Sequence, residues 1–239
     1  WPRWQAFNPV SREAIDHRPW DRFLKTYVKK DSNGVNRVAY GRLGEGGKAA
    51  LADYLDGMAK TPISLYGRPV QKAFWINLYN ALTVRLIIGS YPVTSIQDLD
   101  SPWYQKVIEV EGVALTLNDI EHRILRPIWR DARVHYAVNC ASIGCPNLIP
   151  VAFTGGNISQ LLELAAYSYI NHPRGVRIKD GDLIVSKIYA WFSEDFGGTQ
   201  ESVIAHLREY AKPGLLDALR GRNAIDDYEY DWGLNRAGS

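Results

Sequence analysis

Residues 71–89 constrain the fold most strongly, because apolar side chains occupy nearly every position of this segment. A surface helix carries one polar face, whereas this pattern predicts a helix that is buried on all sides. The dipeptide Tyr91-Pro92 follows and is expected to end the helix. The rest of the chain must therefore supply enough structure to surround one central helix.

The composition allows such a core and excludes several other classes of protein. The chain has 239 residues, of which 46% are hydrophobic, and it carries 8 Trp, 14 Tyr and 6 Phe. Lys and Arg number 28 against 26 Asp and Glu, so the charge balance gives no support to nucleic-acid binding. Asn77, Asn80 and Arg85 interrupt the apolar segment, which therefore does not resemble a transmembrane span.

The remaining elements alternate without a regular βαβ rhythm, which predicts a single α+β domain. Residues 1–45 are expected to pack on the core as a peripheral segment, and residues 46–239 to form the domain itself. The patterns predict hairpins over 107–115 and 176–185 and strands over 132–139 and 225–234. They predict helices over about 117–126, closed by Pro127, and over 158–170, 186–196, 200–210 and a short stretch after Pro213.

The two cysteines, Cys140 and Cys145, are the first candidates for chemistry. Their spacing does not match a four-ligand zinc signature, so we expect neither a metal nor another cofactor. Four interpretations remain open: a local disulfide, a redox pair, a nucleophile beside a bystander, or two buried thiols. Free cysteine is often simply a small buried apolar residue.

Cys140 stands where the predicted strand ends and a loop rich in turn residues begins. A thiol attacks as its thiolate, so it needs a neighbouring base, which His135 can supply with Glu121 as the orienting carboxylate. The chain must turn at Asn139 or Cys140, since a regular strand would direct His135 and Cys140 to opposite faces. Otherwise His135 is a core histidine and Glu121 an exposed helix charge. His122 competes as the base.

Two asparagines form a separate signal within the central helix. Asn77 and Asn80 are three positions apart, so they face the same direction. Buried amides must be hydrogen-bonded, and these two either tie the helix to neighbouring loops or line a cleft and donate to an oxyanion. Asn139 and Ser142, which flank Cys140, complete the candidate substrate-binding or oxyanion set.

Several segments together resemble the family known as domain of unknown function 547, over about residues 60–235. The resemblance is carried by residues 74–81 (FWINLYNA), 115–121 (LTLNDIE), 131–142 (DARVHYAVNCAS) with Cys145-Pro146, 186–192 (SKIYAWF) and 228–235 (YEYDWGLN). The name of this family does not specify an activity. The resemblance implies bacterial exported members, and plant members in which the domain follows a coiled coil.

A more remote similarity connects the chain to papain-like and transglutaminase-like cysteine enzymes. It implies a central helix packed on a mainly antiparallel sheet, with a nucleophile that normally begins that helix. Here the helix offers Trp75 and Asn77 but no thiol, so the similarity implies either a site in which Cys140 has moved to the strand side or a scaffold that has lost its enzyme activity. The only methionine is Met58, and a processed start of this kind is expected of an exported, periplasmic or extracellular protein.

The leading hypothesis is a thiol-dependent hydrolase or acyl transferase that acts on peptide or amide bonds. Cys140 attacks, His135 transfers the proton, and Glu121 holds the imidazole. The first alternative is a non-catalytic module that binds a peptide, a glycan or a protein on its aromatic surface. The second is a redox pair of Cys140 and Cys145. The expected partner is a small-molecule or peptide substrate.

Overall fold

The central helix predicted from the apolar segment is confirmed as α3, Arg68–Ser90, in the computed structural model, which describes residues 1–238. Every residue from 71 to 84 is buried, as the absence of a polar face predicts. Pro69 lies in the first turn, where its missing N–H breaks no hydrogen bond. Among residues 1–238, none of the helices combines the length and apolar character needed to cross a bilayer.

Most of the other predicted elements are confirmed within a few residues. The helices are α1 (Arg18–Tyr27), α2 (Glu45–Ala59), α4 (Arg126–Trp129), α5 (Ile158–Ile170), α6 (Ile188–Trp191), α7 (Gln200–Tyr210) and α8 (Pro213–Leu219). The strands are β1 (Val28–Lys30), β2 (Asn36–Val38), β3 (Ile108–Val110), β4 (Val113–Leu115), β5 (Val176–Lys179), β6 (Asp182–Ser186) and β7 (Asp227–Glu229).

The α+β class is confirmed, with three small sheets rather than one large one. Antiparallel hairpins join β1 to β2, β3 to β4 and β5 to β6, and β7 lies parallel beside β6. Helices surround much of α3: it contacts α2, α5 and the helical turns that precede α4. The central helix is thus buried mainly by other helices, and no sheet of more than three strands forms within residues 1–238.

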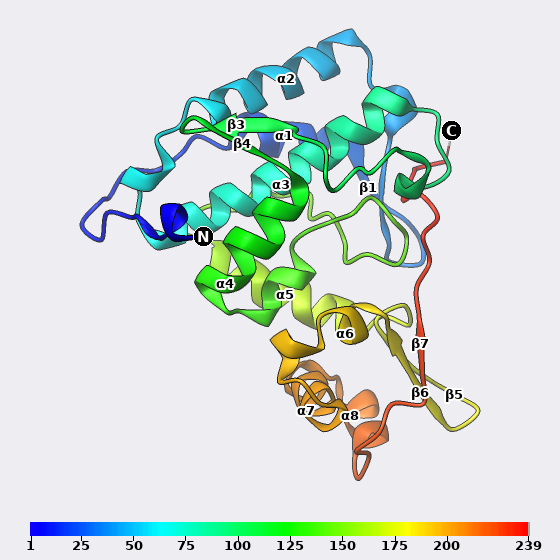
Figure 1. The fold of residues 1–239 in the computed structure, drawn as a ribbon. Helices are drawn as coiled ribbons and strands as arrows, with labels where there is room; N and C mark the ends of the chain where they lie inside the picture. The colour runs from blue at the N-terminus through cyan, green and yellow to red at the C-terminus, as the bar shows by residue number, and fades with distance from the viewer. Residues whose placement is uncertain (239) are drawn as a thin grey trace.

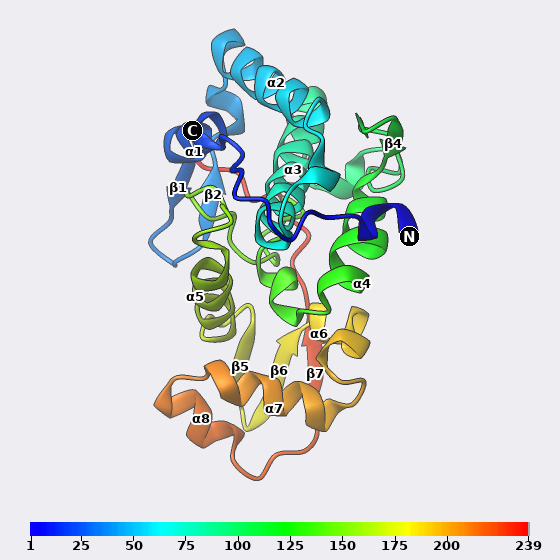
Figure 2. The ribbon, with the colours of Figure 1, turned by 90° about the vertical axis from the view of Figure 1, so that its left-hand side faces the viewer.

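The apolar side chains form two clusters that α5 connects. The larger cluster surrounds α3 and includes Ile158 and Leu162 from the start of α5. The smaller one lies among β5, β6, α7 and α8 and includes Tyr169 and Ile170 from the end of α5. Figure 1 shows α1 to α3 in the upper part and α6 to α8 in the lower part, and Figure 2 shows α7 and α8 lying across the bottom. In the N-terminal segment, Trp20 is buried in the larger cluster.

Two local predictions before Cys140 are wrong. The predicted strand over 132–139 begins instead as a 3-10 helix, Ala132–Tyr136, because Asp131 caps its first turn by accepting from the backbone N–H of Arg133 at 3.0 Å. Residues 134–139 are all buried, so their apolar–polar alternation marks no single buried face. Pro127 does not close the preceding helix either. That helix takes a π register over Asp119–Leu125, and Pro127 falls in the first turn of α4.

The C-terminal segment links the two ends of the fold. The predicted closing strand is confirmed over Asp227–Glu229, after which the chain runs back along the molecule until Arg236 pairs with Val38 (Figure 1). On the way it passes directly over the loop that holds the cysteines. Gly144 N–H donates to the carbonyl of Asp231 at 2.8 Å, and a Cβ on Gly144 would lie 2.8 Å from the Asp231 nitrogen. This close approach requires glycine.

Candidate active site

The central helix positions the cysteine loop through the side chain of Asn80. Its amide N–H donates to the carbonyl of Ala137 at 2.8 Å, and its carbonyl oxygen accepts from the backbone N–H of Asn139 at 2.8 Å. Asn77, one turn earlier, holds both backbone groups of Phe153 in the same way, at 2.7 and 3.0 Å. The helix therefore fixes the cysteine loop at Asn139 and the chain beyond it at Phe153.

The chain turns at Cys140, as a shared site with His135 requires. Asn139 holds the turn, because its carbonyl oxygen accepts from the N–H of Ala141 at 2.9 Å and its amide donates to the carbonyl of Pro146 at 2.7 Å. Ala141 has a φ of 60°, in the left-handed region. The turn directs the two cysteine side chains of the loop toward each other.

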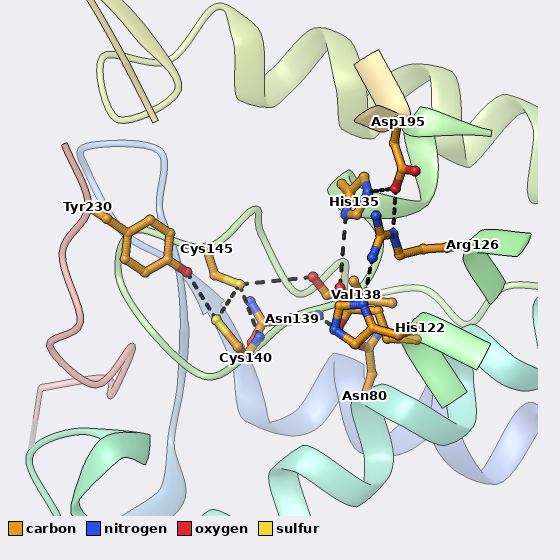
Figure 3. Close-up of polar contacts among 11 residues, drawn as sticks. Asn80, His122, Arg126, His135, Val138, Asn139, Cys140, Cys145, Asp195 and Tyr230 are labelled. Atoms are coloured by element: carbon orange, nitrogen blue, oxygen red, sulfur yellow. Dashed lines mark hydrogen bonds and ion pairs between the residues drawn. The ribbon is translucent and has the colours of Figure 1, made fainter. Parts of the chain in front are cut away.

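The two free thiols lie in direct contact. Sγ of Cys140 is 2.8 Å from Sγ of Cys145, 3.0 Å from the hydroxyl of Tyr230 and 3.2 Å from the hydroxyl of Ser142 (Figure 3). The backbone N–H of Cys140 donates to Sγ of Cys145 at 3.0 Å. Cys140 is half-buried and Cys145 is buried, so the first of the two is the more accessible sulfur.

These contacts push the two thiol pKa values apart. The hydrogen bond from Cys145 lowers the pKa of Cys140 to about 7, against the effect of burial and with help from Ser142 and Tyr230. Burial raises the pKa of Cys145 well above its usual value, and the Cys140 sulfur raises it further. Near neutral pH a large fraction of the molecules therefore carries a thiolate on Cys140, which is the nucleophilic form, while Cys145 stays a thiol.

Alkylation by iodoacetamide will test the origin of this shift. Because only the thiolate reacts, the alkylation rate of Cys140 is expected to rise with pH around a midpoint of about 7. Cys145→Ala removes the main hydrogen bond that lowers this pKa, so the midpoint moves upward and the rate at neutral pH falls several-fold.

Cys145→Ser serves as the matched control, because its hydroxyl can still donate to the Cys140 sulfur and the midpoint should stay near neutral pH. Rates would be measured by mass spectrometry across a pH series. An unchanged midpoint in Cys145→Ala would mean that Cys145 does not stabilise the thiolate.

A second cluster, built around His135, lies on the other side of Val138 and Asn139 (Figure 3). Nε2 of His135 is 2.6 Å from a carboxylate oxygen of Asp195, and Nδ1 is 3.9 Å from Glu121. The ring stacks on Phe192 with 4.2 Å between centroids. Asp195 also accepts from Arg126 at 2.5 Å. Burial alone would raise the pKa of Asp195, but the hydrogen bonds from His135 and Arg126 outweigh it and lower that pKa well below its usual range.

The same network distinguishes the two candidate bases. A guanidinium has no acceptor, so the 2.7 Å contact between Arg126 and Nδ1 of His122 is a hydrogen bond that Arg126 donates. His122 therefore keeps its proton on Nε2, and burial lowers its pKa. His135 instead donates Nε2–H to the ionised Asp195 and leaves Nδ1 free to accept a proton. Of the two imidazoles, His135 is better placed to act as a base.

The thiols and the histidine cluster line one pocket of about 210 Å³. Glu121, His122 and His135 form one part of its wall, and Cys140 with Cys145 another. Its other walls are largely aromatic: Tyr79, Trp103, Tyr104, Trp191, Phe192, Tyr230 and Trp232. Within residues 1–238, no hydrogen bond joins the His135 ring to the Cys140 sulfur: the ring contacts Asp195 through Nε2, and the sulfur contacts Cys145, Ser142 and Tyr230. The two groups face a common space in which a substrate can lie between them.

The predicted oxyanion residues lie elsewhere. Asn77, Asn80 and Asn139 give their amide groups to the backbone, and none of them lines the pocket. Ser142 is 1% exposed and contacts Cys140 from behind the pocket wall. These four side chains hold the loop and its sulfur rather than face a ligand.

Sequence reasoning missed two residues that the fold brings to the site. Asp195 contacts His135 in the way expected of Glu121, and the hydroxyl of Tyr230 contacts the sulfur of Cys140. Tyr230 falls within the quoted segment 228–235, and Asp195 follows the segment 186–192 by three residues. The aromatic density of these two segments was the available signal, but nothing in it indicated contact with Cys140 or His135.

Asn80→Ala tests how strongly α3 holds the cysteine loop. The substitution leaves the buried N–H of Asn139 and the buried carbonyl of Ala137 without these partners. At about 1–3 kcal/mol for each of the two unsatisfied groups, we expect the free energy of unfolding to fall by about 2–6 kcal/mol in urea titrations. Gln160→Ala, which removes an exposed amide from α5, should change it by less than about 0.5 kcal/mol. Equal effects would contradict the anchoring role.

Fold and pocket together define an α+β protein with a thiol pair opposite a histidine–carboxylate cluster. Residues 63–170, a little under half of the chain, match the model of the family described as "Protein of unknown function, DUF547", which supports the resemblance to that family. The match contains Glu121, His135 and both cysteines but neither Asp195 nor Tyr230. No curated protein and no solved structure matches the chain significantly.

Proposed function

We propose that the pocket carries out thiol-dependent acyl transfer, as a hydrolase or acyl transferase on peptide or amide bonds. The observation that carries the proposal is that Cys140, with its pKa lowered to about 7, lines the same pocket as His135. His135 is held by Asp195, which gives it the tautomer and orientation of a proton-transfer group. A candidate nucleophile and a candidate base therefore line one space of about 210 Å³, and Asp195 contacts the base from outside that space.

The reaction has two steps. Nδ1 of His135 first takes up the proton that the Cys140 thiol gives up. The resulting thiolate attacks the carbonyl carbon and forms a C–S bond, while the C–N bond breaks and the leaving amine takes that proton from His135. In the second step His135 removes a proton from water, the hydroxide attacks the thioester carbon, and the C–S bond breaks to release the acid and the thiolate. An amine that replaces water gives transfer instead of hydrolysis. The aromatic walls exclude bulk water and favour substrates with an apolar acyl group.

The test uses an activated acyl donor, p-nitrophenyl acetate, and the full chain. We expect a burst of p-nitrophenolate that approaches one equivalent of protein, followed by slower turnover, and one acetyl group on the peptide that contains Cys140. Peptide mapping by mass spectrometry locates the acetyl group. Acetylation spread over surface lysines with no burst would refute the proposal.

A second candidate, dithiol redox chemistry, is favoured by the 2.8 Å contact between the two sulfurs. The Cys140 thiolate would attack a substrate disulfide and release one thiolate, and Cys145 would then attack the mixed disulfide and release the other. Oxidised glutathione distinguishes the two functions: this route predicts an internal disulfide in the wild type and a stable glutathione adduct on Cys140 in Cys145→Ala. The exported location expected from the sequence would favour the oxidised pair.

A further inference from the structure

A groove of about 500 Å³ lies apart from the thiol pocket, and nothing in the proposed acyl transfer uses it. Residues of β1, of α5 and of the chain around Asn147 line it, and no residue lines both cavities. Cys145 and Pro146 line the thiol pocket, whereas Asn147 lines the groove, so the cysteine loop separates the two spaces. The volume is that of a site for a drug-sized ligand or a short peptide.

The walls of the groove are apolar and partly open to solvent. They include Leu161, Leu164 and Tyr167 from one face of α5. Leu164 is 53% exposed and Tyr167 44% exposed, so two large apolar side chains of the groove are in contact with solvent. A ligand that covers them gains apolar contact area.

The charges that line the groove are all positive. Lys30, Arg174 and Lys212 are its charged residues, and no aspartate or glutamate lines it. Within residues 1–238 none of the three forms a salt bridge, whereas Lys25, Lys48 and Arg222, for example, each pair with an acidic side chain on the same helix or loop. The three cations come from separate segments: Lys30 ends β1, Arg174 precedes β5 and Lys212 follows α7.

Two details show that the positive charge is a fixed part of the groove. Arg174 is held by hydrogen bonds to the carbonyl of Ile143 at 2.9 Å and to the side chain of Asn147 at 2.6 Å. His172 adds no charge, because Nε2 donates to the carbonyl of Asn33 at 2.8 Å and Nδ1 accepts from the N–H of Arg174. Burial lowers the pKa of His172, which keeps it neutral.

We infer that this groove binds an acidic peptide segment in which carboxylates alternate with apolar side chains. The carboxylates would pair with Lys30 and Lys212, which form no salt bridge, and the apolar side chains would cover Leu164 and Tyr167, whose ring lies 5.7 Å from the Lys212 ammonium. A single small anion would leave the apolar wall exposed, and a neutral apolar ligand would leave the cations unpaired. The peptide is the occupant whose chemistry matches both.

Fluorescence anisotropy with a labelled peptide of alternating glutamate and leucine tests this inference. We expect saturable binding by the full chain that weakens as salt is raised. Lys30→Glu and Lys212→Glu should each weaken binding at least threefold, and the double variant at least tenfold. Lys60→Glu is the matched control, because Lys60 is exposed at the end of α2, outside the groove, and should leave the affinity unchanged.

Three comparisons can overturn the inference. Equal affinity for a lysine–leucine peptide would contradict the role of charge complementarity. Equal affinity for free glutamate would indicate a simple anion site. Equal affinity for a single-stranded oligonucleotide would indicate a general polyanion surface. Absence of binding at millimolar peptide would also overturn it. Cys140→Ala should not change the peptide affinity, so failure of the acyl-transfer proposal leaves this test intact. Circular dichroism and the alkylation rate of Cys140 verify the fold of each variant.

Discussion

Cys140→Ala is expected to abolish the p-nitrophenolate burst and the acetylated peptide. Both cysteines line the pocket, but only Cys140 has a lowered pKa, of about 7, because burial keeps the pKa of Cys145 high. The loss should exceed a thousandfold in burst rate, because no other thiolate is available at neutral pH. Stopped-flow absorbance measures the burst directly.

Two measurements separate loss of the nucleophile from loss of the fold. The backbone around Cys140 is held by Asn80 and Asn139, not by its sulfur, so Cys140→Ala should change the free energy of unfolding by less than about 1 kcal/mol. Cys145→Ser keeps a donor beside Cys140 and should retain most of the burst. A burst that survives in Cys140→Ala would place the nucleophile elsewhere.

Asp195→Asn has the second largest expected effect, a decrease of about a thousandfold or more in the burst rate. Asp195 accepts the Nε2 proton of His135 at 2.6 Å, which leaves Nδ1 free as the base. An amide at this position can donate to Nε2 instead, which would place the proton on Nδ1 and remove the base. The same exchange in a serine-protease triad lowers the rate by about ten thousandfold.

The alkylation rate of Cys140 shows whether Asp195 acts through His135 or merely supports the fold. Asp195 makes no hydrogen bond to the thiol pair, so Asp195→Asn should leave the alkylation midpoint near neutral pH while it slows acyl transfer. Glu194→Gln removes an exposed carboxylate from the same 3-10 helix and should change neither rate. A parallel fall in both rates would indicate structural damage instead.

The elements that sequence predicted well are those whose signal is local. Helix α3 is predicted because its apolar residues leave no polar face, and the hairpin of β3 and β4 because Glu111-Gly112 forms its turn. The segment 132–139 fails for a physical reason. Alternation indicates a strand only where one face is buried, and residues 134–139 are buried throughout, so the cap at Asp131 decides the local structure.

The candidate site was predictable as far as its residues lie close together in sequence. Cys140 and His135 are five positions apart, and both line one pocket because the chain turns at Cys140. Asp195 is 60 positions from His135 and Tyr230 is 90 from Cys140, and such pairings follow from packing that no local pattern encodes. The similarity to papain-like and transglutaminase-like enzymes stays a prediction.

Because the C-terminal segment passes back over the cysteine loop, the surroundings of the Cys140 thiol are completed only late in synthesis. A fragment limited to residues 63–170 would hold both cysteines and His135 while lacking the hydroxyl of Tyr230 and the carboxylate of Asp195. During synthesis the sulfur of Cys140 thus emerges from the ribosome long before the groups that tune it. The hydrogen bond from Cys145 can form early, whereas the contribution of Tyr230 to the lowered pKa of Cys140 is added only once Tyr230 has been synthesised and has docked.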